Sequence, residues 1–165
     1  DLSQPVDAEL RWQVRKYEGE VIAQDSISVR LEPRTSRIIF AKSLDELRKD
    51  SAENEAYFYF ELVKGDNALS SNIHHFSELK RVYLPKPEIQ KKVLIQGKKI
   101  SVTLESTKFA KDVYLSAPGI KGRFSDNFFD MIPGRIYEVE FLSDEEIDPS
   151  KFEKSLTVIS LRDSY

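Results

Sequence analysis

The chain has 165 residues, of which 40% are hydrophobic and 32% are charged, and its formal net charge is −3. This composition is typical of a folded globular protein, and the charge gives no electrostatic basis for partnership with nucleic acid or a membrane surface. The apolar runs fall far short of the roughly 20 residues that a membrane-spanning helix needs, and the lack of cysteine excludes disulfides and thiolate chemistry.

In the first half of the chain, apolar residues recur at every second position. Leu10, Trp12 and Val14 alternate with polar residues, and strand-like segments follow at 27–31, 37–41 and 56–62. A period of two predicts half-buried antiparallel strands. The segment 43–54 differs, because it starts with a possible serine cap and has leucines at helical spacing. It predicts a short helix or an irregular crossover.

The pattern breaks at Leu84-Pro85-Lys86-Pro87. Two prolines at alternate positions cannot both lie in a central strand, and they stiffen the chain towards polyproline II. We therefore predict a boundary here, with one domain over residues 1–84 and a second over residues 85–165.

Strand-like segments resume after the boundary, at residues 89–95, 100–104, 113–115, 120–124, 136–141 and 152–161. Gly97-Lys98 and Pro118-Gly119 stand where turns are needed. About seven short strands in each half, separated by turn signals, are typical of immunoglobulin-type sandwiches. The predicted fold is all-β, with two tandem immunoglobulin-like β-sandwiches.

The chain offers few residues for catalysis or metal binding. His74 and His75 are adjacent in a strand-like stretch, so their side chains point to opposite faces and are unsuited to one shared site. Carboxylate pairs such as Asp126 and Asp130 lack an evident cleft for sugar hydrolysis, and their spacing is not that of a calcium loop. We predict no catalytic residue, no metal site and no cofactor.

The lysines between Lys86 and Arg123 are interpreted as exposed residues of strand faces and hairpin tips, since few aromatic residues accompany them for stacking on nucleic-acid bases. Tyr57 and Tyr59 are more informative. They are out of phase with the phenylalanines of the same strand, so we expect them to face outward or into a neighbouring domain. They are the candidates for stacking against a sugar ring, although packing at an interface is favoured over ligand binding.

Two parts of the second half are distinctive: residues 100–115 and the run Phe124-Ser-Asp-Asn-Phe-Phe-Asp-Met-Ile-Pro-Gly134. They resemble the last immunoglobulin-like domain of β-mannosidases in glycoside hydrolase family 2. The first half is similar to the preceding sandwich domain, through Leu10-Arg-Trp-Gln-Val, Gly19-Glu-Val-Ile and Asn72-Ile-His-His-Phe. The run Tyr83-Leu-Pro-Lys-Pro-Glu-Ile89 is similar to the joint between them.

This resemblance places the chemistry elsewhere. In that family two catalytic glutamates lie on a (β/α)₈ barrel, which takes about 250 residues and is longer than this chain. The resemblance implies a non-catalytic accessory fragment of an enzyme that hydrolyses terminal, non-reducing β-D-mannose residues with retention. It also implies the barrel and other parent domains as partners, a mannose-containing oligosaccharide as a candidate ligand, and a bacterial periplasmic or extracellular location.

Two alternatives stay open at this point. One is a carbohydrate-binding sandwich that uses Tyr57 and Tyr59. The other is the equivalent region of a different family 2 exo-glycosidase, such as a β-galactosidase, because the choice of substrate is made in the barrel.

The run from residue 125 to residue 135 has turn residues at both ends and apolar residues between them. It lies between two predicted strands, where an immunoglobulin-like chain passes from one sheet to the other. We predict a structural corner made by Phe128, Phe129, Ile132, Pro133 and Gly134. One of the phenylalanines, with the isoleucine, would close the core, the glycine would take a positive φ, and the carboxylates would cap turns.

Overall fold

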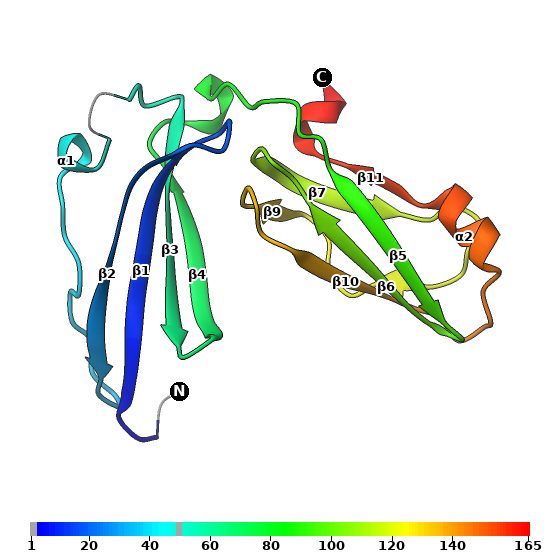
Figure 1. The fold of residues 1–165 in the computed structure, drawn as a ribbon, viewed down its shortest axis with the longest axis horizontal. Helices are drawn as coiled ribbons and strands as arrows, with labels where there is room; N and C mark the ends of the chain where they lie inside the picture. The colour runs from blue at the N-terminus through cyan, green and yellow to red at the C-terminus, as the bar shows by residue number, and fades with distance from the viewer. Residues whose placement is uncertain (1–2, 49–50) are drawn as a thin grey trace. The chain divides into compact units, whose positions relative to one another are not determined.

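A computed structural model describes residues 3–48 and 51–165 of the chain. The chain divides into two units, Asp1–Tyr83 with one sheet and Leu84–Tyr165 with two, and each unit has its own hydrophobic core (Figure 1). Every strand pair within the described ranges is antiparallel. The predicted all-β fold is confirmed. Within these ranges no helix is long and apolar enough to cross a membrane.

The first unit is built on one four-stranded sheet with the order β2-β1-β3-β4. Its elements are β1 (Val6–Lys16), β2 (Val21–Leu31), α1 (Leu44–Arg48), β3 (Ala56–Lys64), β4 (Asn67–His75) and the 3-10 helix η1 (Leu79–Arg81). Trp12 lies opposite Phe60 and Val14 opposite Phe58, so alternate residues of neighbouring strands share one buried face. Irregularities interrupt the register at Val14 in the β1–β2 pair and at Leu62 in the β3–β4 pair.

The buried face of this sheet is covered by the segment between β2 and β3. The Phe40 ring lies 5.3 Å from that of Trp12 and 5.7 Å from that of Phe58, and Leu47 of α1 joins the same core. The prediction of a strand at 37–41 is wrong, because within the described residues this segment pairs with no strand. Phe40 instead packs its ring into the core. The layer opposite the sheet is thus irregular backbone and a short helix.

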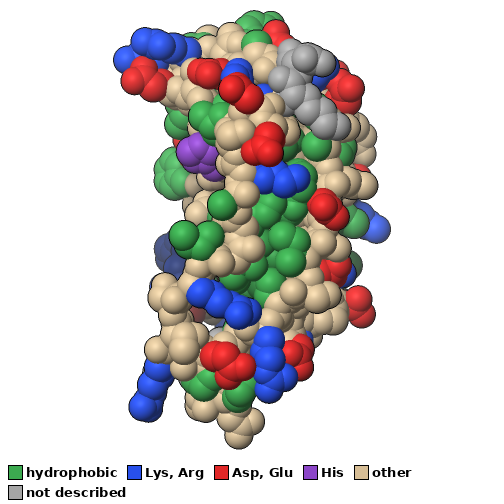
Figure 2. Space-filling view, turned by 90° about the vertical axis from the view of Figure 1, so that its left-hand side faces the viewer, with side chains coloured by type: hydrophobic (Ala, Val, Ile, Leu, Met, Phe, Trp, Pro, Cys, Tyr) green, Lys and Arg blue, Asp and Glu red, His purple; other side chains and the backbone are tan. Residues whose placement is uncertain are grey.

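The start of α1 follows from its sequence. The Ser43 hydroxyl and backbone N–H both donate to the Glu46 carboxylate at 2.8 Å, and the Glu46 N–H donates to the Ser43 hydroxyl oxygen at 3.3 Å. This reciprocal pair is a capping box, and it confirms the predicted cap. Figure 2 shows the side of the molecule next to this segment, where hydrophobic side chains gather in the middle and charged side chains border them. Ile38, at 86% exposed, is one of the apolar residues that the irregular segment leaves open.

The second unit has two sheets, with the orders β5-β6-β10-β8 and β11-β7-β9. Its elements are β5 (Gln90–Gln96), β6 (Lys99–Glu105), β7 (Ala110–Ser116), β8 (Arg123–Phe124), β9 (Phe129–Met131), β10 (Tyr137–Leu142), α2 (Pro149–Ser155), β11 (Thr157–Ile159) and the 3-10 helix η2 (Leu161–Ser164). Both sheets contribute buried residues to one core: Ile100, Val102, Leu104, Val113, Leu115, Met131, Val139 and Phe141.

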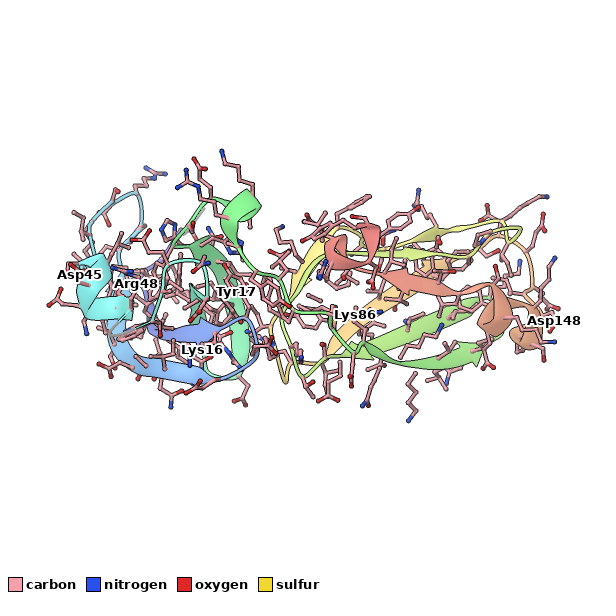
Figure 3. All side chains as sticks on the ribbon, turned by 90° about the horizontal axis from the view of Figure 1, so that it is seen from above. Lys16, Tyr17, Asp45, Arg48, Lys86 and Asp148 are labelled. Carbon is pink, nitrogen blue, oxygen red and sulfur yellow. The ribbon has the colours of Figure 1, made fainter. Side chains whose placement is uncertain are left out.

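Two predicted strands of this unit are wrong over part of their length. The segment 152–161 starts inside α2, because Asp148 accepts hydrogen bonds from two backbone N–H groups and Pro149 occupies the first turn (Figure 3). The segment 120–124 forms a strand only at its end. Gly122 has φ 151°, and a Cβ there would stand 2.5 Å from the Phe141 ring, so the chain approaches the core here too closely for a side chain.

Candidate functional site

The distinctive run 125–135 crosses between the two sheets of the second unit. β8 before it pairs with β10, and β9 within it pairs with β7. Residues 125–128 therefore carry the chain from one sheet to the other. The turn after β9 ends at Gly134, whose φ is 75° and whose N–H donates to the Ser106 carbonyl at 2.9 Å. Glycine takes this left-handed conformation without the steric cost of a side chain.

The apolar residues of the run have different environments. Ile132 and Pro133 are buried, and Phe129 packs against the core and stacks on Tyr137, with ring centroids 5.6 Å apart. Of the two phenylalanines predicted as alternatives for closing the core, Phe129 is therefore the one that packs there, whereas 67% of Phe128 is exposed. Its φ is 61°, an uncommon conformation for an aromatic residue. The ring instead stacks on Tyr114 of β7 at 5.0 Å.

The polar residues of the run are bonded to β7 as well as to local turns. The Asn127 side chain accepts from the Leu115 N–H at 2.6 Å and donates to the Leu115 carbonyl at 3.1 Å. Asp126 accepts from the N–H of Asn127, as a turn cap does. Asp130 does not cap a local turn, since its partners lie on β7.

Those partners are Lys111 and the backbone of Asp112. Asp130 accepts from the Lys111 ammonium and from the Asp112 N–H, both at 3.0 Å, and Lys111 also pairs with the Asp112 carboxylate. The Lys111 side chain is only 14% exposed, so its interpretation as an exposed surface lysine is wrong. Burial alone would lower the pKa of Lys111, but the hydrogen bonds to Asp112 and Asp130 outweigh burial and raise this pKa. The alternation of β7 residues gave no signal for this cluster, because a register shift follows Ala110.

Tyr57 and Tyr59 lie on the face of the first sheet opposite Trp12, as their phase predicted. Neither ring is open to solvent, since their exposed fractions are 0% and 6%. Tyr57 packs on Tyr17 with ring centroids 5.1 Å apart, and the Tyr59 hydroxyl donates to Glu61 at 2.8 Å. The expected open platform is therefore absent at these two positions, and sugar binding by them stays a prediction. The strand period indicated the face correctly but carried no information on what covers it.

The two histidines point to opposite faces. His75 Nδ1 lies 2.7 Å from the Tyr17 hydroxyl, at the end of β1 (Figure 3), whereas His74 is exposed. Over residues 3–48 and 51–165, no group of three or more His, Asp or Glu side chains is arranged to hold a metal ion. The carboxylates in these ranges engage mainly in ion pairs, caps and turns.

The two units correspond to two sequence families. Residues 1–81 match a family described as a mannosidase Ig/CBM-like domain, and residues 84–164 match a mannosidase family described as an Ig-fold domain. The chain belongs to the mannosidase immunoglobulin-like domains. We call the chain the mannosidase domain pair, and the two matches together cover all but a few of its residues. They confirm that both halves are immunoglobulin-like domains.

Some solved structures have a fold similar to that of the pair. It is similar to the β-D-mannosidase of Dictyoglomus thermophilum, with a TM-score of 0.76 and 18% identity, over 96% of this chain and 19% of that chain. At this identity the likeness shows the fold alone. The exo-chitosanase CsxA of Amycolatopsis orientalis aligns with a TM-score of 0.48 and 11% identity, over 96% of this chain and 24% of that chain. No curated protein sequence matches the mannosidase domain pair.

Proposed function

We propose that this chain is a non-catalytic accessory region of a β-mannosidase of glycoside hydrolase family 2. The parent enzyme would remove terminal, non-reducing β-D-mannose residues with retention of configuration. The observation that carries this proposal is the tandem order of two mannosidase domain families along one chain. The common fold with a β-D-mannosidase over 96% of the chain supports it.

The side-chain geometry is in keeping with an accessory role. A retaining glycosidase needs two carboxyl groups about 5–5.5 Å apart on either side of a sugar-binding cleft. Asp130, the least exposed carboxylate of the run 125–135, is tied to β7 by Lys111 and by a backbone N–H. Asp126 lies in an exposed turn.

We also propose the catalytic barrel and the other domains of the parent as the partners of this chain. Two compact sandwich-type units with separate cores are suited to packing against a larger domain and holding it in place. The chain spans only 19% of the length of the β-D-mannosidase that it resembles, so such a parent has ample surface for this contact.

The proposal is tested with the full-length protein that contains this chain and with the 165-residue chain alone. Both are assayed on 4-nitrophenyl β-D-mannoside and 4-nitrophenyl β-D-galactoside. We expect turnover of the mannoside by the full-length protein and none by the chain. Clear turnover by the chain alone would contradict the accessory role, and a preference of the full-length protein for the galactoside would contradict the assignment to a mannosidase.

A further inference from the structure

The face of the first sheet opposite Trp12 presents polar side chains at regular intervals. β1 contributes every second residue, about 7 Å apart along the strand, and the register places residues of β2 and β3 beside them. We call this set the polar ladder: Asp7, Glu9, Arg11, Gln13, Arg15, Gln24, Ser26, Ser28, Arg30 and Glu61. Most of these side chains end in planar carboxylate, amide or guanidinium groups, which donate and accept hydrogen bonds in fixed directions.

The members of the polar ladder hold one another in place. Arg11 Nε donates to Glu9 at 2.7 Å, Arg15 donates to Gln13 at 2.9 Å, and Gln13 donates to Gln24 at 3.1 Å across the β1–β2 pair. Such contacts fix the planar groups before a ligand arrives, which lowers the entropic cost of binding. Arg11 nevertheless remains 50% exposed and Glu9 35% exposed, so both stay within reach of a molecule in solution.

Glu9 is held as an ionised acceptor. A hydrogen bond from Ser26 and, next to it, one from Arg11 lower the pKa of Glu9 below its ordinary value. At neutral pH this carboxylate therefore accepts hydrogen bonds, while the neighbouring guanidinium donates them. Along β1 the acceptors Asp7 and Glu9 are followed by the donors Arg11 and Arg15, with Gln13 between the arginines offering both kinds of group. Such a face suits a ligand whose groups both donate and accept, as hydroxyls do.

The charges of the polar ladder cancel. Asp7, Glu9 and Glu61 balance its three arginines, and Arg30 pairs with Asp7 at 3.2 Å. Two neighbours outside the ladder also contact Arg30 and balance each other: Glu32, at 3.0 Å from its Nε, and Arg37, which donates to its carbonyl. A polyanion such as nucleic acid requires an excess of positive charge, and a cation requires an excess of carboxylates. This surface therefore favours a ligand that is polar and uncharged.

One end of the polar ladder is hollow. The residues that line an open depression of about 520 Å³ include Asp7, Glu9, Ser28 and Arg30 and the buried Val63. The depression is shallow and combines an apolar residue with several polar groups, as sites for small ligands commonly do. The rest of the ladder extends from this hollow along β1.

We propose that the polar ladder and its hollow bind a neutral oligosaccharide, with Arg11 and Gln13 donating to sugar hydroxyls and Glu9 accepting from them. The ring-stacking role expected of Tyr57 and Tyr59 is replaced by recognition of hydroxyl groups on an open sheet face. This binding function goes beyond the accessory role proposed above and does not depend on it, since a domain of any parent enzyme can bind carbohydrate.

The test is a titration of the ¹⁵N-labelled 165-residue chain, followed by its amide NMR spectrum. The probes are a β-1,4-linked mannotetraose, cellotetraose and, as a charged counterpart, tetragalacturonate, each up to about 10 mM, which detects millimolar dissociation constants. We expect one or both neutral sugars to shift the amides of β1 and β2 in a saturable way. Binding of the charged sugar only, shifts confined to the second unit, or no shift at 10 mM would overturn the proposal.

A double variant with Arg11→Ala and Gln13→Ala gives the second test. We expect it to bind the neutral sugar at least tenfold more weakly. The control Arg81→Ala, which removes an exposed arginine of η1 that is not part of the ladder, should leave the affinity unchanged. Unchanged affinity in a folded double variant would overturn the proposal. If the double variant does not fold, the map of shifted amides in the unmodified chain decides. The hydrolysis assay of the full-length protein is a separate readout, so failure of either proposal is recognised independently.

Discussion

Lys111 shows how one charge is accommodated beneath the surface of the second unit. Its ammonium lies between two carboxylates, and Asp112 reaches this position with φ 49°, in the left-handed region. An aspartate tolerates this conformation better than most residues do. The left-handed backbone at Asp112, the register shift between Ala110 and Val113 and the ion pair therefore lie at the same place in the chain.

We predict that Lys111→Met lowers the free energy of unfolding by about 1–3 kcal/mol at neutral pH, because the two carboxylates lose their charged donor. The pKa of Lys111 is raised in the folded state. Its contribution is thus complete below the ordinary lysine pKa of about 10.4 and disappears as the pH rises through the folded pKa. Urea unfolding of both proteins between pH 7 and pH 11.5 should show the difference closing only at the alkaline end.

The matched control is Lys121→Met. Lys121 also forms an ion pair, with Glu145 at 2.7 Å, but its side chain is 83% exposed. Solvent screens such a pair, so no measurable loss of stability is expected. Equal losses for the two substitutions would show that burial does not strengthen the Lys111 pair.

At the scale of elements, the crossing from β8 to β9 depends on an asparagine rather than on an aromatic plug. The Asn127 amide bonds both the N–H and the carbonyl of Leu115, so it takes the place of a backbone partner where β9 has not yet begun. A side-chain amide can do this because it carries one donor group and one acceptor group, as a peptide does. Phe129 then enters its half-buried position as the first residue of β9.

We predict that Asn127→Ala lowers the free energy of unfolding by about 1–3 kcal/mol, since the substitution leaves the backbone groups of Leu115 without their partner. Asp126→Ala, one residue earlier, removes a single exposed turn bond and should change stability by less than about 0.5 kcal/mol. Chemical unfolding of both variants measures the two costs. If the aspartate variant loses as much stability as the asparagine variant, the turn itself, and not the link to β7, holds the crossing.

The sequence predicted helices and strands correctly where a segment carried one clear pattern and no competing one. The alternation of Leu10, Trp12 and Val14 indicated β1 and its buried face, and Ser43 indicated the start of α1. The prediction of secondary structure failed where contacts with distant residues determine the conformation of a segment. Ile38 and Phe40 are residue types typical of strands. The segment nevertheless forms no strand, and it is attached to the core through the Phe40 ring. Phe152 lies in a helix because Asp148 caps its start and Pro149 occupies its first turn. These two residues are typical of a helix start, but the apolar alternation that follows them favoured a strand.

The candidate site was less accessible to sequence reasoning than the fold. Periodicity placed Tyr57 and Tyr59 on the correct face, but their burial depends on packing that no local pattern encodes. The sequence showed that Arg11, Gln13 and Arg15 alternate with the apolar residues of the same strand and so lie on its other face. Their arrangement as a bonded ladder required the register with β2, which a sequence does not give.

At the scale of the molecule, the second unit carries a complete core of its own. The core cluster and the residues packed on it all fall between Ile89 and Val158. We predict that residues 84–165 fold when produced alone, as domains of this size can. A cooperative urea transition and a dispersed amide spectrum that overlays the corresponding part of the 165-residue chain would check this. A broad transition with poorly dispersed signals would show that this core is insufficient.

The first sheet ends in two long edge strands, β2 and β4, and an edge strand can pair with a strand from another molecule. Irregular register at Val14 and Leu62 interrupts the flat pairing on both sides of this sheet. β4 is also almost wholly exposed and rich in asparagine and serine, and β2 carries Asp25 near its middle. These features act against edge-to-edge aggregation. A substitution that straightens either strand or makes it apolar would therefore threaten the yield and storage life of the protein before it affected any binding.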